Sequence, residues 1–183
     1  MKVIIACEFS GIVREAFREK GHDAWSCDLL PAEDGSKFHI RGDVVVPLIR
    51  GGWDLMIAHP PCTYLAVSGA RWFKGKEKKQ EQALNFVKML LDQPIAKIAL
   101  ENPVSIISSR IRKPDQIVQP FYFGDPFRKT TCLWLKGLPP LKRTSDMTTG
   151  KQACWREPPH KDRWKRRSRT YLGFAIAMAS QWG

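Results

Sequence analysis

No stretch of this 183-residue sequence approaches the roughly 20 consecutive apolar residues that a membrane-spanning helix needs. The N-terminus also lacks the cleavage pattern of a signal peptide, because it runs directly into a strand-like segment. We therefore expect a cytoplasmic protein that does not contact a membrane.

Paired cysteines are lacking as well. The five cysteines are scattered, odd in number and never spaced as Cys-x-x-Cys, which fits reduced thiols better than a disulfide framework. Cys154 and His160 flank a short segment and could ligate a metal, but two further ligands are missing for a zinc site. We predict no metal site.

Carboxylates are scarce: 18 Asp and Glu stand against 30 Lys and Arg, which gives a formal net charge of +12. Such an imbalance favours a polyanionic partner, and nucleic acid is the first candidate. Solubility alone is the alternative explanation of the charge.

Short apolar runs alternate with segments of helical spacing along the first hundred residues. Strands are indicated in the segments KVIIACEFSG, HDAWSCDLL, WDLMIAHPP and AKIALENP, and helices in IVREAFREKG and KEKKQEQALNFVKMLLDQP. This alternation predicts a single α/β domain over residues 1–183, with a doubly wound, mostly parallel sheet. Ligands of such sheets bind at the carboxyl ends of the strands.

The second half follows a different pattern. The segments QIVQPFYFG and TTCLWLKGLPPL predict two strands that pair as an edge β-hairpin. Residues 142–169 are basic and poor in aliphatic side chains, which predicts a loop, and the apolar segment YLGFAIAMASQW predicts a final helix docked on the sheet. We take residues 136–169 as a possible, reduced DNA-recognition region.

The turn after the first predicted strand has the features of a nucleotide site. Gly11 opens a helix whose N-terminal amide groups can meet a ligand, and Phe9 can lie against an adenine face. Asp28 ends the second predicted strand, where a carboxylate can accept hydrogen bonds from a ribose diol, and Asp43 can accept one from an exocyclic amine. The alternatives are a tight strand-to-helix turn and, for Asp43, an ordinary surface turn.

Cys62 and Glu101 each follow a buried strand, and we expect both at the same rim of the sheet. Cys62 is placed as an exposed nucleophile, although free cysteines are more often buried and inert. A carboxylate beyond a buried strand is costly without a partner or a function. Together, a thiolate and a carboxyl group form a nucleophile and acid pair.

Two basic segments interleave cations with aromatic residues. The segment KDRWKRRSR places Trp164 among cations that can bind phosphates, while the aromatic ring can stack on an unpaired base. The segment SGARWFKGKEKK lies where a lid over the site would be needed. Each could instead be a solvated surface segment. The proposed DNA-binding residues are Arg163, Lys165, Arg166, Arg167 and Arg169.

The ordered set EFSG, Asp28, GDV, PPC and ENP resembles the motifs of DNA cytosine carbon-5 methyltransferases, and small phage and prophage enzymes most of all. The resemblance covers roughly residues 1–135, and the closing helix is similar as well. The chain departs from the family in three ways: it lacks a second glycine in FSGIV, it has FRKTT where the family has Gln-x-Arg-x-Arg, and it offers only residues 136–169 for sequence recognition.

The resemblance implies a Rossmann-like methyltransferase fold and transfer of a methyl group from S-adenosylmethionine to carbon 5 of cytosine in DNA. In that mechanism a flipped cytosine is attacked at carbon 6 by Cys62 while Glu101 binds or protonates the ring nitrogen. Asn102 would orient the Pro-Cys loop, and Lys129 would replace an arginine of the catalytic site. The implied cofactor-binding residues are Glu8, Phe9, Ser10, Gly11, Asp28, Leu29 and Asp43.

Three alternatives remain open. A free pyrimidine nucleotide could be the substrate, which would explain the small recognition region. The chain could also be a DNA-binding protein with an inactive methylase fold. Finally, the two prolines before Cys62 are similar to the Pro-Pro loop of amino-group methyltransferases, which carry an aromatic residue in place of the cysteine and need no thiol.

Overall fold

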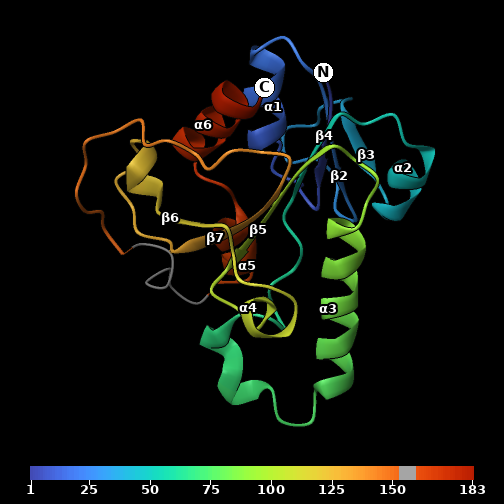
Figure 1. Ribbon diagram of the computed structural model, residues 1–183, viewed down its shortest axis with the longest axis vertical. Helices are drawn as coiled ribbons and strands as arrows, with labels where there is room; N and C mark the ends of the chain where they lie inside the picture. The colour runs from blue at the N-terminus through green and yellow to red at the C-terminus, as the bar shows by residue number, and fades with distance from the viewer. Residues whose placement is uncertain (153–159) are drawn as a thin grey trace.

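The computed structural model describes residues 1–152 and 160–183 (Figure 1). These residues form a seven-stranded sheet of strand order β3-β2-β1-β4-β5-β7-β6. The strands are β1 (Lys2–Ala6), β2 (Asp23–Asp28), β3 (His39–Arg41), β4 (Leu55–Ala58), β5 (Lys97–Pro103), β6 (Gln116–Val118) and β7 (Thr131–Lys136). Strands β1 to β5 pair in parallel, and β7 runs antiparallel to both β5 and β6. The prediction of a doubly wound, mostly parallel α/β sheet is confirmed.

Helices lie on both faces of this sheet (Figure 1). They are α1 (Ile12–Glu19), α2 (Val45–Arg50), α3 (Glu77–Leu91), α4 (Ile107–Arg110), α5 (Arg163–Ser168) and α6 (Leu172–Trp182), with the 3-10 helices η1 (Val67–Trp72) and η2 (Pro120–Phe123). None of the helices within the described ranges has the length and apolar content needed to cross a bilayer.

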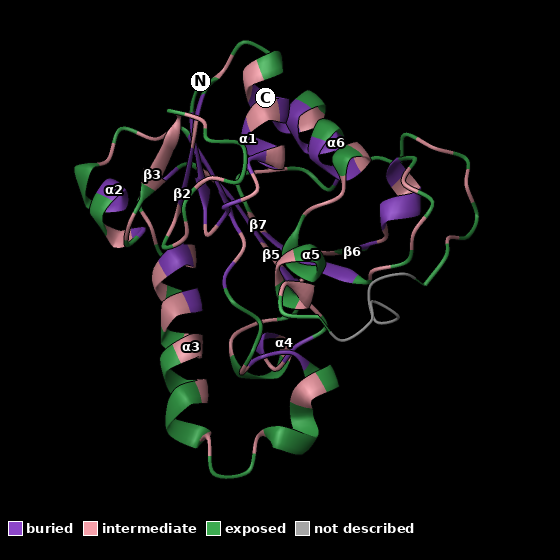
Figure 2. Cartoon of the chain, turned by 180° about the vertical axis from the view of Figure 1, so that it is seen from behind, coloured by how far each residue is buried: buried purple, intermediate pink, exposed green. Residues whose placement is uncertain are grey.

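The strands separate two apolar cores because successive side chains of a strand point to opposite faces. In β1, Val3 and Ile5 join a buried cluster with residues of α1 and α6, whereas Ile4 and Ala6 join a second cluster with residues of α2 and α3. Figure 2 shows the sheet buried between these layers. All four of these side chains are fully buried, so β1 forms the centre of the fold.

The predicted antiparallel pair at the sheet edge is present, but its first strand is shorter than expected. Only Gln116–Val118 pair with β7, and Pro120–Phe123 form η2 instead of continuing the strand. Proline explains the change, because it lacks the N–H that a strand ladder needs and its fixed φ suits the first turn of a helix.

The prediction of a loop over residues 142–169 is wrong for its last part, where Arg163–Ser168 form α5. The composition of this segment favoured a loop because no apolar face repeats along it. Tertiary contacts hold it instead: the Trp164 ring lies 6.1 Å from the Phe9 ring, centroid to centroid, and Arg169 pairs with Glu33 at 2.9 Å.

Candidate functional site

The candidate site lies at the carboxyl rim of the four central parallel strands. Strand register aligns Ala6 of β1 with Cys27 of β2 on one side and with Ala58 of β4 on the other, and Ala58 in turn with Leu100 of β5. The residues that follow these four positions therefore emerge side by side. The structure brings the ends of four strands to one edge, as the alternation of strands and helices predicted.

Glu8 closes the first turn of α1. Its carboxylate accepts hydrogen bonds from the backbone amides of Val13 (2.7 Å) and Arg14 (3.2 Å), and from the Ser10 hydroxyl (3.3 Å). Burial raises the pKa of Glu8, while these amides and the charges of His59 and Arg14 oppose the rise. Glu8 thus supplies acceptors to helix amides that lack partners within the helix. A contact from Glu8 to a cofactor stays a prediction.

The turn itself requires unusual backbone conformations at two positions. Gly11 has φ of 76°, a value that glycine adopts without steric cost, and Cys7 has φ of 60° although it carries a side chain. The left-handed residue at Cys7 redirects the chain immediately after β1, which brings the Glu8 carboxylate back to the start of α1.

Phe9 packs below the surface at this rim, in the turn between β1 and α1. Its side chain is buried, and its ring contacts Trp164 of α5 with ring planes tilted by 53°. The backbone carbonyl of Phe9 also accepts a hydrogen bond from the amide of Glu33, at 2.9 Å. Both α5 and the loop after β2 therefore pack at the edge of the predicted cofactor turn.

The acidic residues predicted to meet the cofactor keep acceptor capacity. Asp28 Oδ1 accepts a hydrogen bond from the Leu30 amide at 2.9 Å, and Asp43 Oδ1 accepts one from the Val45 amide at 2.9 Å. An ionised carboxylate has about four acceptor positions, so each side chain can accept further bonds. Leu29, between the strand and its turn, is 73% exposed.

Cys62 sits in the loop after β4, on a tight turn. Its carbonyl accepts hydrogen bonds from the amides of Leu65 (3.0 Å) and Ala66 (2.9 Å). The buried side chain of Asn102, at the end of β5, donates from Nδ2 to the Pro60 carbonyl at 2.9 Å. The loop is therefore held by β5, and Cys62 itself is exposed at the surface.

Glu101 lies on the adjacent strand and contacts a histidine that the sequence did not single out. His59 Nδ1 is 3.1 Å from Glu101 Oε2, and both side chains are largely buried. Burial opposes ionisation of Glu101, but hydrogen bonds from His59 and Thr131 and the charges of Lys129 and His59 outweigh it and hold the pKa of Glu101 below its usual value. The signal for His59 was its position directly after β4, at the same rim as Glu8 and Glu101.

Opposing charges act on the Cys62 thiol. Desolvation by the surrounding chain raises the pKa of Cys62, and the charge of Glu101 raises it further. The cations Lys129 and Arg167 oppose part of this rise. Lys129 Nζ in turn donates to the carbonyl of Arg169 at 3.3 Å, which joins the segment before β7 to the residue that follows α5. The structure thus brings Cys62, Glu101 and Lys129 close enough to interact electrostatically.

The basic helix α5 carries no buried residue, and Figure 2 shows it among the exposed and intermediate parts of the chain. Arg169, just after it, is anchored by Glu33, while Lys165 lies over the ring of Trp164 at 5.7 Å. The structure therefore places the predicted DNA-binding residues beside the rim that carries Cys62 and Glu101. Contact with DNA stays a prediction.

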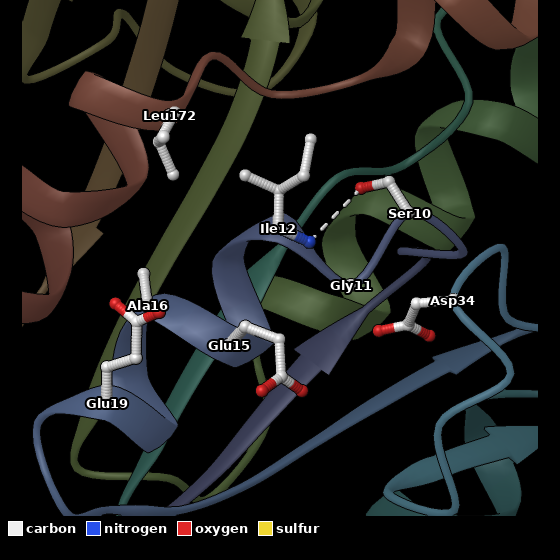
Figure 3. A pocket seen from close by; sticks show the side chains of 8 residues that line it. All are labelled: Ser10, Gly11, Ile12, Glu15, Ala16, Glu19, Asp34 and Leu172. Atoms are coloured by element: carbon white, nitrogen blue, oxygen red, sulfur yellow. Dashed lines mark hydrogen bonds between the residues drawn. The ribbon is translucent and has the colours of Figure 1, made fainter.

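A pocket lies on the outer side of the Gly11 turn (Figure 3). Ser10 and Gly11 of the predicted cofactor set line it, together with Ile12, Glu15, Ala16, Glu19, Asp34 and Leu172. Neither Cys62 nor Glu101 lines this pocket, so it is not the place where the two groups could act on a common substrate. The candidate site is therefore the rim and not this pocket.

No group of three potential metal ligands occurs within residues 1–152 and 160–183. Cys154, one of the two candidate ligands, lies outside the described residues, as does part of the proposed recognition region.

The chain matches no protein-family profile and no curated protein. Among solved structures, it resembles an E. coli protein encoded within a prophage, to which a DNA modification methyltransferase activity has been provisionally assigned. The two share 15% sequence identity and superpose with a TM-score of 0.51 over 81% of this chain. The match covers 53% of that protein, so this chain spans about half its length. The chain therefore shares its α/β fold with that protein.

Proposed function

We propose that this protein is an S-adenosylmethionine-dependent DNA methyltransferase that methylates carbon 5 of cytosine through Cys62. One observation carries the proposal: an exposed thiol in the loop after β4 and a carboxylate near the end of the adjacent parallel strand β5 lie at one rim, with the cation Lys129 near both. A methyltransferase-like fold and the positive charge of the chain support the class of reaction and the choice of DNA as the substrate.

The residues present fit the cofactor. S-adenosylmethionine supplies the methyl group when it is bound. The Gly11 turn would lie along it, the remaining exposed part of the buried Phe9 side chain would face the adenine, and Leu29 would lie at the edge of that face. Asp28 and Asp43 retain acceptor positions for the ribose hydroxyls and the adenine amine. Ser10 and Glu8 would remain engaged with the first turn of α1.

Carbon 6 of cytosine cannot be attacked inside the base stack, so the target base must leave the duplex. Its ring would then lie between Cys62 and Glu101. The Cys62 sulfur would form a bond with carbon 6, and the Glu101 carboxyl group would stabilise the charge that develops on ring nitrogen 3. Carbon 5 becomes nucleophilic by this addition. Loss of its proton after methylation would expel the sulfur and restore the aromatic ring.

Lys129 would stabilise the ionised forms of both Cys62 and Glu101. A cation within reach of both Cys62 and Glu101 favours the thiolate and the carboxylate over their protonated forms. Because the pKa of Cys62 is raised overall, the thiol is mainly protonated at neutral pH, and the cations that reduce this rise matter for the rate. Lys129 can do this without touching the base.

α5 would bind the DNA backbone beside the flipped base. Lysine and arginine side chains bind phosphates without reading sequence, which suits a helix with several cations and no buried residue. The proposed contacts are Arg163, Lys165, Arg166, Arg167 and Arg169.

Identification of the methylated nucleoside tests the proposal. The protein would be incubated with DNA and isotopically labelled S-adenosylmethionine, and the digested product analysed by mass spectrometry. We expect 5-methyldeoxycytidine in the wild type and none with Cys62→Ala. A methylated amino group would instead favour the amino-group alternative, and a labelled free nucleotide with unlabelled DNA would favour the nucleotide alternative. Binding of DNA without any transfer would favour the inactive-fold alternative.

A further inference from the structure

We propose that His59 is the proton reservoir of Glu101: it holds the carboxylate in place and supplies the proton that Glu101 passes to the target base. This inference rests on the proposed function, because it assigns a role within the same site. It concerns a residue that the motif resemblance does not include, since His59 stands immediately before the Pro-Pro-Cys sequence.

The geometry joins the two side chains directly. His59 follows β4 and Glu101 lies in β5, and strand register places Ala58 beside Leu100. The distance between His59 Nδ1 and Glu101 Oε2 is 3.1 Å, and the side chains are 10% and 13% exposed. The two groups are therefore paired in a largely dry environment, where a hydrogen bond to an ionised group is stronger than in water.

The direction of the hydrogen bond follows from the charge on Glu101. An ionised carboxylate has no proton to give and can only accept. The charges and hydrogen bonds around Glu101 hold its pKa below the usual value, so the carboxylate is ionised near neutral pH. His59 Nδ1 must therefore carry the proton of this pair. Glu101 alone would be a poor proton donor to nitrogen 3 of cytosine, although the proposed reaction needs one.

The second ring nitrogen supports a functional role. His59 Nε2 is buried and finds no hydrogen-bond partner among the described residues. A buried polar atom without a hydrogen-bond partner destabilises the folded state, a cost that a purely structural histidine would not normally incur. The charged groups that act on this part of the site are Glu101 from β5, Glu8 after β1 and Lys129 beside β7.

Each proton transferred in the proposed reaction has a donor and an acceptor. The Cys62 thiol first loses its proton to solvent. When the resulting thiolate bonds to carbon 6, nitrogen 3 takes a proton from Glu101, and Glu101 takes the Nδ1 proton of an imidazolium at His59. Neutral imidazole and carboxylate remain. After methylation, carbon 5 loses its proton to solvent, the thiolate leaves, and nitrogen 3 returns its proton to Glu101 and His59. No reactant besides the methyl donor and solvent is needed.

The variant His59→Asn separates two roles of His59: positioning the Glu101 carboxylate and supplying a proton to it. Asparagine can donate a hydrogen bond to Glu101 but has no titratable proton, and His59→Gln places an amide near the Nε2 position instead. With either variant, Glu101 must pick up its own proton from solvent. We expect single-turnover methyl transfer to fall about 100-fold at neutral pH, in the range typical of the removal of a general acid.

A pH series distinguishes this role from a structural one. The ratio of variant to wild-type rate should fall further as the pH rises from about 6 to about 8, because the variant depends on the protonated fraction of the Glu101 carboxyl group alone, and that fraction decreases as the pH rises. Ionisation of Cys62 enters both rates and largely cancels in the ratio. His22→Asn, a change at the opposite ends of the strands, should match the wild type at every pH.

Nuclear magnetic resonance provides a readout that needs no turnover. The buried Nδ1–H should give a downfield, slowly exchanging imidazole signal that disappears in both His59→Asn and Glu101→Ala. A ratio that stays constant with pH, or the absence of this signal in the wild type, would overturn the inference while leaving methylation by Cys62 intact. If the wild type transfers no methyl group to DNA, the proposed function fails, and the inference fails with it.

Discussion

The side-chain amide of Asn102 and the backbone carbonyl of Pro60 are joined by a hydrogen bond of 2.9 Å that links the end of β5 to the loop carrying Cys62. Asn102 is almost completely buried, so its Nδ2 group has no ready alternative partner in water. The position of the thiol thus depends on a residue of the neighbouring strand.

Removal of this hydrogen bond should affect both stability and reaction rate. We expect Asn102→Ala to lower the free energy of unfolding by about 1 to 3 kcal/mol and Asn102→Asp to lower it more, because a buried carboxylate cannot donate to the carbonyl. Denaturant titration measures the first effect and methyl transfer the second. Ser109→Ala, an exposed change nearby in the chain, should be close to neutral; equal losses in both proteins would contradict the account.

The reactivity of Cys62 should rise with pH. Since the pKa of the thiol is raised, alkylation by iodoacetamide should increase about tenfold per pH unit through the neutral range. Lys129→Gln removes a cation that lowers this pKa and should shift the profile to higher pH, whereas Glu101→Gln removes an anion and should shift it to lower pH.

Mass spectrometry of each cysteine-containing peptide follows this titration. Cys7 serves as an internal reference, because burial and nearby carboxylates raise its pKa to about 12 and it should stay unmodified. Identical profiles for wild type, Lys129→Gln and Glu101→Gln would show that the two charges do not act on Cys62.

DNA affinity should depend on α5 through salt. Replacing Lys165 and Arg167 by Ala should weaken binding on every sequence tested and reduce the slope of log affinity against log salt by about 0.9 for each phosphate that the protein no longer neutralises. Fluorescence anisotropy at several salt concentrations measures both quantities. The double variant Lys20→Ala/Lys88→Ala removes the same charge elsewhere, so an equal reduction in slope would refute a specific role of α5.

Glu8 should contribute to stability through the first turn of α1. Glu8→Ala removes the acceptor for two buried amides, and we expect a decrease of about 2 kcal/mol in the free energy of unfolding. Glu19→Ala, an exposed carboxylate at the end of the same helix, should change it by less than about 0.5 kcal/mol. Unchanged stability of Glu8→Ala would mean that these hydrogen bonds are readily replaced.

The rim of the sheet was predictable because parallel strands place their carboxyl ends at one edge. Cys62, Glu101 and Asp28 follow short apolar runs, so their neighbourhood required only that the runs be parallel strands. The role of Glu8 was harder to predict from the sequence. A carboxylate after a strand has the same sequence pattern whether it meets a ligand or caps a helix, and only the hydrogen bonds distinguish the two.

Contacts between segments that are distant in the chain could not be predicted from the sequence. The pairing of His59 with Glu101 spans 42 residues and depends on the register of β4 and β5, which no local pattern encodes. The helix α5 was missed for the same reason. It is held by Phe9 and Glu33, far away in the sequence, and not by an apolar face of its own.

The most direct test of the central claim is covalent trapping. Fluorine at carbon 5 of cytosine cannot leave as a proton does, so an enzyme that has added its thiol to carbon 6 stays attached to the DNA. We would incubate the wild type and Cys62→Ala with S-adenosylmethionine and DNA containing 5-fluorocytosine, in several sequences, and determine masses after denaturation. The account predicts an adduct on Cys62 in the wild type alone. Binding of both DNA and cofactor without any adduct would contradict it and leave Cys62 a turn residue.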